Sequence, residues 1–199
     1  LSHPLFMFLT ADLITRLEPI MIVLVSPQGA LNLGSIARVM KNMGLSRLTL
    51  VNPQCDPHGD EARRMAVHAF DILEQARIVH TIPEAIATVT RTIATTARSR
   101  SVEAPLLPPE VGLPWLLDTP SALLFGPEDR GLSNDELAYA QRFVGIPSTE
   151  AYPSLNLAQA VAVCARDLVR AAQTGTQIKD TSAIDYARLV MANRGASFG

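Results

Sequence analysis

Cysteine and histidine are scarce in this 199-residue chain. Its two cysteines, Cys55 and Cys164, are too far apart in sequence to form a paired motif, which argues against a disulfide scaffold and fits a reducing compartment. His58 follows Cys55 by three positions, but no second pair of ligands comes after it, so this segment is better explained as a loop than as a metal site. We therefore expect a cytoplasmic protein with no metal.

Strong net charge and long hydrophobic runs are also missing. Seventeen lysines and arginines stand against 19 acidic residues, giving a formal net charge of −2. Proteins that coat nucleic acid without specificity are usually basic, so RNA binding here would need a local basic patch, within one chain or across subunits. No apolar run approaches the ~20 residues of a membrane-spanning helix. Residues 1–19 lack both a basic leader and a small-residue cleavage site.

Apolar runs typical of buried strands alternate with helical patterns through most of the chain. The predicted strands cover 20–26, 47–52, 77–81, 91–97, 121–126 and 142–147. The predicted helices cover about 32–43, 60–69, 83–90, 115–118, 133–140 and 156–173. This alternation predicts an α/β domain with a mostly parallel sheet and helices on both faces. We expect an N-terminal extension at 1–19, one domain at 20–174 and a C-terminal tail at 175–199.

The segment NLGSIARVMKNMG (32–44) has the pattern of a short amphipathic helix. At ~100° per residue, its apolar side chains share one face: Ile36, Val39, Met40 and Met43. Gly44 stands where a C-terminal cap belongs. Arg38 and Lys41 fall on the opposite side, so packing does not explain the arginine. It is either a solvated surface residue or a cation with a function.

Three loops after the later predicted strands, 95–100, 126–137 and 146–156, gather glycine, proline, hydroxyl and charged residues. Ligands of parallel sheets bind at this edge, beyond the carboxyl ends of the strands. Gly126 and Gly131 have P-loop spacing, but Leu132 occupies the position of the required lysine. The dinucleotide fingerprint and the G-x-S-x-G nucleophile motif are also missing. The remaining groups suit a neutral or cationic adenosine ligand beside a polyanion, and methyl transfer from a sulfonium needs positioning more than acid–base groups.

Three segments carry a family resemblance: NLGSIARVMKNMGLSRLTLVNP (32–53), LLFGPEDRGLSNDEL (123–137) and IPSTEAYPSLNLAQAVAV (146–163). They resemble, in the same order, the three motifs of SPOUT-class RNA 2′-O-methyltransferases of the TrmH family. TTARSR (95–100) is similar to a loop of the TrmJ-like subgroup, which modifies the anticodon loop of tRNA. The resemblance covers residues 20–173. Residues 1–19 lie outside it, and the tail from Thr174 is too short for the extra helical region of some members.

The resemblance implies a SPOUT fold with a deep C-terminal trefoil knot, a feature that general folding rules alone would exclude. It implies S-adenosylmethionine as the cofactor and a ribose 2′-hydroxyl of tRNA or rRNA as the methyl acceptor. The implied cofactor-binding residues are Thr95, Thr96, Ala97, Gly126, Ile146, Pro153, Ser154 and Leu155. Family members often have serine in place of Pro153, and a contact through the backbone carbonyl would survive that change.

The resemblance also implies a role for each polar motif residue: Arg38, Asn32, Glu128, Ser154 and Asn156. Arg38 is the residue that activates the 2′-hydroxyl. Because guanidinium hardly ever loses its proton, stabilising the developing alkoxide is its better-supported role, although proton removal stays open. Each of the others has a structural alternative. Asn32, Ser154 and Asn156 could cap helices, and Glu128 could be a solvated carboxylate.

Arg98, Arg100 and Arg130 are candidates for an RNA-facing patch, although single arginines are more often plain surface residues. The alanine-rich helix at 156–173 would let a second helix approach closely, and the family dimerises near this region. A homodimer would bring Arg38 of one subunit toward the cofactor pocket of the other. Two alternatives stay open: an RNA-binding protein that keeps the fold without catalysis, and a Rossmann-like small-molecule methyltransferase.

Overall fold

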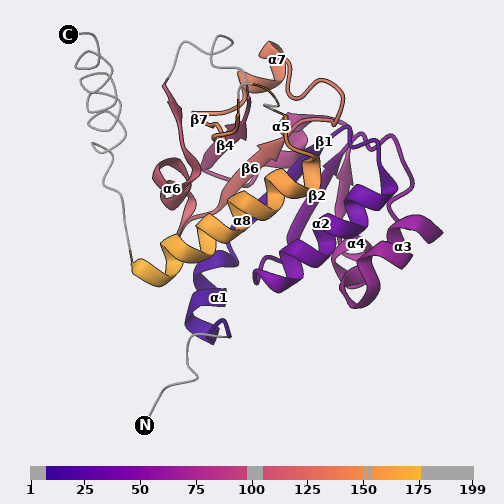
Figure 1. Ribbon diagram of the computed structural model, residues 1–199, viewed down its shortest axis with the longest axis horizontal. Coiled ribbons are helices and arrows are strands. Elements are labelled where there is room, and N and C mark those ends of the chain that lie inside the picture. Colours follow the sequence, from indigo (N-terminus) through magenta and orange to yellow (C-terminus); the bar gives the residue numbers. More distant parts are fainter. Residues whose placement is uncertain (1–7, 98–104, 150, 152–153, 176–199) are drawn as a thin grey trace.

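The computed structural model describes residues 8–97, 105–149, 151 and 154–175 (Figure 1). Its centre is a parallel sheet of seven strands in the order β3-β2-β1-β6-β4-β7-β5. The strands are β1 (Ile20–Val25), β2 (Arg47–Val51), β3 (Arg77–Val79), β4 (Arg91–Thr95), β5 (Leu106–Leu107), β6 (Ser121–Phe125) and β7 (Arg142–Val144). The predicted α/β architecture is therefore confirmed. All predicted strands form, each ending somewhat earlier than expected, and β5 is an addition at the sheet edge.

Helices cover both faces of this sheet. On one face lie α1 (Ala11–Leu17), α2 (Ala30–Asn42), α3 (Asp60–Ala66), the 3₁₀ turn η1 (Val67–Ala69), α4 (Phe70–Glu74), α6 (Pro109–Gly112), the 3₁₀ turn η2 (Leu113–Leu116) and α8 (Leu157–Thr174). On the other face lie α5 (Ile82–Ile86) and α7 (Asn134–Leu137). α2 and α8 run next to each other across the sheet (Figure 1). Among the described residues, no helix is both long and apolar enough to span a bilayer.

The central strand β1 shows how the sequence builds two cores. Ile20, Ile22 and Leu24 are fully buried on the α2 and α8 face. The alternate residues Met21 and Val23 are buried on the α5 and α7 face. Successive side chains of a strand point to opposite faces, so a continuous apolar run is what a strand covered on both sides requires.

Helix α1 lies within the segment for which the sequence predicted only an extension. Thr10 caps it by accepting a hydrogen bond from the Leu13 amide at 3.4 Å. Its last residue, Leu17, is completely buried in the main core. Arg16 forms an ion pair with Asp118 at 2.8 Å, so the helix is fixed to the rest of the domain by both packing and charge.

Gly34 allows α2 to lie unusually close to α3. A Cβ atom on residue 34 would come within 2.5 Å of the Ala62 carbonyl oxygen and 2.6 Å of the Met65 Cβ. We expect Gly34→Ala to destabilise the protein by about 1–3 kcal/mol, because the two backbones must separate. Thermal unfolding checks this against Ser35→Ala, a half-buried neighbour on the same helix. Equal unfolding temperatures for both variants would contradict the close approach.

Candidate functional site

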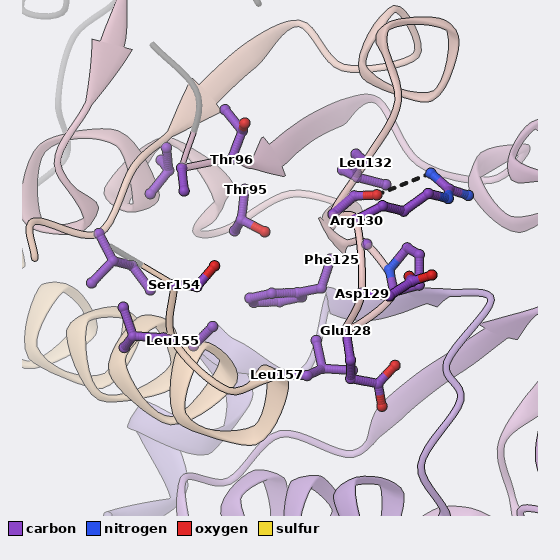
Figure 2. Close-up of a pocket in the computed structure, with 17 residues that line it drawn as sticks. Thr95, Thr96, Phe125, Glu128, Asp129, Arg130, Leu132, Ser154, Leu155 and Leu157 are labelled. Atoms are coloured by element: carbon purple, nitrogen blue, oxygen red, sulfur yellow. Dashed lines mark hydrogen bonds between the residues drawn. The ribbon is translucent and has the colours of Figure 1, made fainter. Parts of the chain in front are cut away.

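A pocket of about 370 Å³ opens at the carboxyl ends of β4, β6 and β7, beside the start of α8 (Figure 2). Its volume lies in the range of small-molecule sites, roughly 300–1,000 Å³. Seven of the predicted cofactor residues line it: Thr95, Thr96, Ala97, Gly126, Ile146, Ser154 and Leu155. The eighth, Pro153, lies outside the described residues. The structure therefore brings together loops that are far apart in sequence, as the loop composition predicted.

Apolar side chains form much of the pocket wall, and sequence reasoning did not single them out. They are Phe125, Leu132, Val144, Leu157 and Ala160. Phe125 and Val144 end buried strands, so in the sequence they look like ordinary core residues. The available signal was their position, since each is the last residue of a strand that precedes one of the loops. Thr95, by contrast, uses its hydroxyl inside the fold, donating to the Leu124 carbonyl at 3.0 Å.

Glu128 connects the pocket loop to the start of α2. Its carboxylate accepts hydrogen bonds from the Gln28 amide at 2.9 Å, the Gly29 amide at 3.0 Å and the Asn32 side-chain amide at 2.9 Å. Burial pushes the pKa of Glu128 upward, but the hydrogen bonds from Asn32 and the backbone outweigh it and lower the pKa overall. The carboxylate is thus held ionised at the N-terminus of a helix, where negative charge is stabilising.

Asn32 links Glu128 to the start of α8 through a second hydrogen bond. Its side-chain oxygen accepts a hydrogen bond from the Asn156 side-chain amide at 3.0 Å. Asn156 is the N-cap of α8, accepting from the Ala158 amide at 2.8 Å, which confirms that capping prediction. The capping alternative for Asn32 is wrong, because α2 begins two residues earlier and has Gly29 as its N-cap. Glu128, from a distant loop, binds the amides that precede the helix, and this leaves the Asn32 side chain to join Glu128 with Asn156.

Ser154 is exposed and lines the pocket. It does not cap α8, since Asn156 does so. Arg38 is exposed on α2 on the side away from the buried residues, as predicted, and Gly44 ends the helix with a φ of +70°. Arg38 is not among the residues that line the pocket of its own chain. The structure therefore groups Asn32, Glu128 and Asn156 but leaves Arg38 on a separate surface.

Arg130 lies at the pocket rim and is held by Glu136. Two guanidinium nitrogens contact the two carboxylate oxygens at 2.7 and 2.9 Å, and one also donates to the Gly131 carbonyl at 3.0 Å (Figure 2). The hydrogen bonds of this pair raise the pKa of Arg130 and lower the pKa of Glu136. The other predicted RNA-binding residues, Arg98 and Arg100, lie outside the described residues. No His, Cys, Asp and Glu cluster suited to a metal occurs in the part of the chain that the structure describes.

Residues 19–166 match the model of the SpoU rRNA Methylase family. The chain belongs to this family. It is 44% identical over 171 residues to the tRNA (cytidine/uridine-2′-O-)-methyltransferase TrmJ of Citrobacter koseri, an alignment that covers 84% of this chain and 70% of the relative. It is 42% identical over 182 residues to the tRNA (cytidine/uridine/adenosine-2′-O-)-methyltransferase TrmJ of Pseudomonas aeruginosa, covering 89% of this chain and 70% of that protein.

The fold of the family also matches. The crystal structure of TrmJ from Z. mobilis ZM4 superposes with a TM-score of 0.71 at 37% identity, covering 75% of this chain and 68% of that one. The resemblance inferred from the three motifs is thereby confirmed. The two TrmJ relatives are RNA methyltransferases by name.

Proposed function

We propose that this member of the SpoU family is an S-adenosylmethionine-dependent tRNA 2′-O-methyltransferase that acts on a ribose of the anticodon loop. The observation that carries the proposal is the hydrogen-bond chain Glu128–Asn32–Asn156, which joins all three motifs at the edge of the pocket. The TrmJ relatives support tRNA as the substrate class. No observation favours the inactive alternative, and the sequence keeps Arg38, Glu128, Ser154 and Asn156.

The pocket fits an adenosine with a cationic side chain. Its apolar wall, including Phe125, Leu132 and Leu157, suits the face of a purine, while Glu128 and Asp129 supply negative charge at the rim. Bound here, S-adenosylmethionine would supply a methyl group on a positively charged sulfur. The residues that we propose to hold it are Thr95, Thr96, Ala97, Gly126, Ile146, Pro153, Ser154 and Leu155.

Arg38 is the proposed group that acts on the RNA. Because a guanidinium hardly ever loses its proton, we propose that Arg38 binds the phosphate next to the target ribose and stabilises the negative charge that develops on the 2′-oxygen, while that phosphate accepts the proton of the 2′-hydroxyl. Glu128, Asn32 and Asn156 position rather than react, because their polar atoms bind one another. Ser154, exposed at the pocket, is left to contact the reacting groups.

A homodimer completes the proposed site. Arg38 does not line its own pocket, so we propose that Arg38 of the partner subunit faces it. α8 supports this assembly, because its half-buried Ala162 and Val163 leave an apolar surface against which a second helix can pack. Arg130, together with Arg98 and Arg100, would extend the RNA surface, which combines sparse positive charge from two chains.

The proposed trefoil knot is supported by the order of the strands. β7 lies between β4 and β5, which both precede it in the chain. Helix α8, which follows β7 in the chain, packs against α2, and Asn156 bonds to Asn32 of α2. The proposed domain spans 20–174, with α1 packed onto it from the preceding segment. A cytoplasmic location fits tRNA modification and the free thiols of Cys55 and Cys164.

Labelled methyl transfer tests the function directly. With S-adenosylmethionine carrying a radioactive methyl group, we expect label in bulk tRNA and little in rRNA. A methylated 2′-oxygen cannot attack the adjacent phosphate, so the labelled linkages should survive alkaline hydrolysis as dinucleotides. Heat-denatured protein is the control. RNA binding without transfer would support the inactive alternative, and label in small molecules alone would support the Rossmann-like one.

A further inference from the structure

Val67 has a backbone conformation that its side chain opposes. It follows α3 with φ +52° and ψ −117°. Among the described residues other than glycine, Ser26, Asn52 and Asp118 also have positive φ, but none of them is β-branched. A β-branched residue with positive φ is a genuine outlier, and such strain persists only where the surrounding structure fixes it.

Contacts with α2 on either side of Val67 fix this turn. At one end, a Cβ on Gly34 would lie 2.9 Å from the backbone nitrogen of Ala66. At the other, the Lys41 ammonium donates to the His68 carbonyl at 2.9 Å and forms an ion pair with Asp71 at 2.7 Å. The segment around Val67 therefore lies along one side of α2, between these two anchor points.

Arg38 lies at the exposed edge of that side of α2, next to the buried Gly34. It is four residues after Gly34 and three before Lys41, and residues at these spacings are neighbours on a helix surface. Leu31, seven residues before Arg38, occupies the same stripe. Val67 and Leu31 are each 51% exposed, and the helix spacing together with the two anchor points puts both apolar side chains on the same side of α2 as the exposed arginine. We name Leu31, Arg38 and Val67 the Arg38 patch.

The patch combines features that are unfavourable in the free protein. Val67 is both strained and half exposed, and strain of this kind concentrates at functional sites. Its centre is a guanidinium, and Arg64 on the neighbouring α3 adds a second exposed cation, whereas Lys41 is neutralised by Asp71. A cation between apolar side chains matches a nucleotide, which offers a phosphate next to the C–H groups of its sugar and the face of its base.

We propose that Val67 is a substrate-positioning residue, which contacts the sugar and base of the RNA nucleotide whose phosphate Arg38 binds. This inference rests on the proposed function. The strained turn holds the Val67 side chain in place before RNA arrives, so that no ordering of the turn accompanies binding. Val67 does not act on the reacting atoms; it sets where the ribose lies relative to Arg38.

Val67→Gly separates this role from a structural one. Glycine adopts the observed backbone freely, so we expect an unfolding temperature equal to or above that of the wild type. Loss of the apolar contact should raise KM for tRNA about ten-fold, the lower end of the effect of one methylene in an apolar pocket, because Val67 is half exposed. KM for S-adenosylmethionine should not change. Val67→Ala, which keeps the Cβ, should also raise KM for tRNA and tests the same contact if the glycine variant is unstable.

Ile78→Ala is the matched control, since Ile78 is 48% exposed on the edge strand β3 and has no part in the site. Wild-type KM for tRNA in both Val67 variants would overturn the inference. So would dissociation of the Val67→Gly protein in sedimentation experiments, because the patch would then cover a second copy of the chain. Failure of the wild type to methylate tRNA would instead contradict the proposed function, so the two failures are distinguishable.

Discussion

Arg38→Ala is expected to lower the rate of methyl transfer to tRNA by about 10²- to 10³-fold, the usual effect of removing one donor that stabilises a developing oxyanion. The loss should appear in kcat, because the alkoxide exists only in the transition state. Affinity for S-adenosylmethionine should stay within a few-fold, since Arg38 does not line the pocket of its own chain and is proposed to bind the RNA rather than the cofactor. Single-turnover transfer and equilibrium binding of the cofactor measure the two quantities separately.

Arg38→Lys and Arg77→Ala make this experiment specific. Lysine keeps the charge but loses the planar fork that binds two phosphate oxygens, so its rate should lie between those of the wild type and the alanine variant. Arg77 is an exposed cation on the edge strand β3, and its removal should leave the rate unchanged. If Arg38→Ala transferred methyl at the wild-type rate, Arg38 would have no part in catalysis.

A mixed dimer tests whether the site is shared. Dimers that combine one Arg38→Ala chain with one chain defective in the pocket should keep close to half of the wild-type activity, because one intact Arg38 still faces one intact pocket. Dimers built wholly from chains with both defects should be inactive. A site contained in one chain predicts no activity for the mixed species, apart from what subunit exchange restores.

The amphipathic and alternating patterns were sufficient to predict most of the fold. β1 is a continuous apolar run buried on both faces, and α2 places Arg38 opposite its buried stripe, so local periodicity determined both. Helix α1 and strand β5 were missed for different reasons. α1 has few buried residues and depends on contacts with α8, whereas β5 is only two residues long, too short to show a period.

The pocket could be predicted only in part. Loop composition identified the correct edge of the sheet, because carboxyl ends of parallel strands meet there. The role of Asn32 could not be predicted from the residues next to it in the sequence. Its position before an apolar stripe fits an N-cap. In the structure, however, the helix starts two residues earlier, and the Asn32 side chain binds the distant Glu128 at 2.9 Å. The positive φ of Val67 could not be predicted either, because nothing in the apolar pattern around it indicates that conformation.

Glu128→Ala is expected to lower transfer by about 100-fold, a loss that a displacement of ~1 Å in a catalytic group can cause. The carboxylate joins the pocket loop to the two amides before α2 and to Asn32. Without it, the Asn32 side chain, which also binds Asn156, loses its partner in the pocket loop. Hydrogen bonds to a charged acceptor that is open to solvent stabilise a protein by about 1–2 kcal/mol, so the unfolding temperature should fall by about 2–8 °C.

Glu74→Ala, which removes an exposed carboxylate at the end of α4, is the matched control and should change neither quantity. The pH dependence gives a second, independent readout. Because the pKa of Glu128 is lowered in the folded protein, its stabilisation is complete above the ordinary glutamate value of 4.5 and is lost as pH falls through the lowered pKa. The difference in unfolding temperature between wild type and Glu128→Ala should therefore be constant near neutral pH and shrink in acid. A difference that stayed constant down to the lowest pH would show that the ionised carboxylate does not hold the three motifs together.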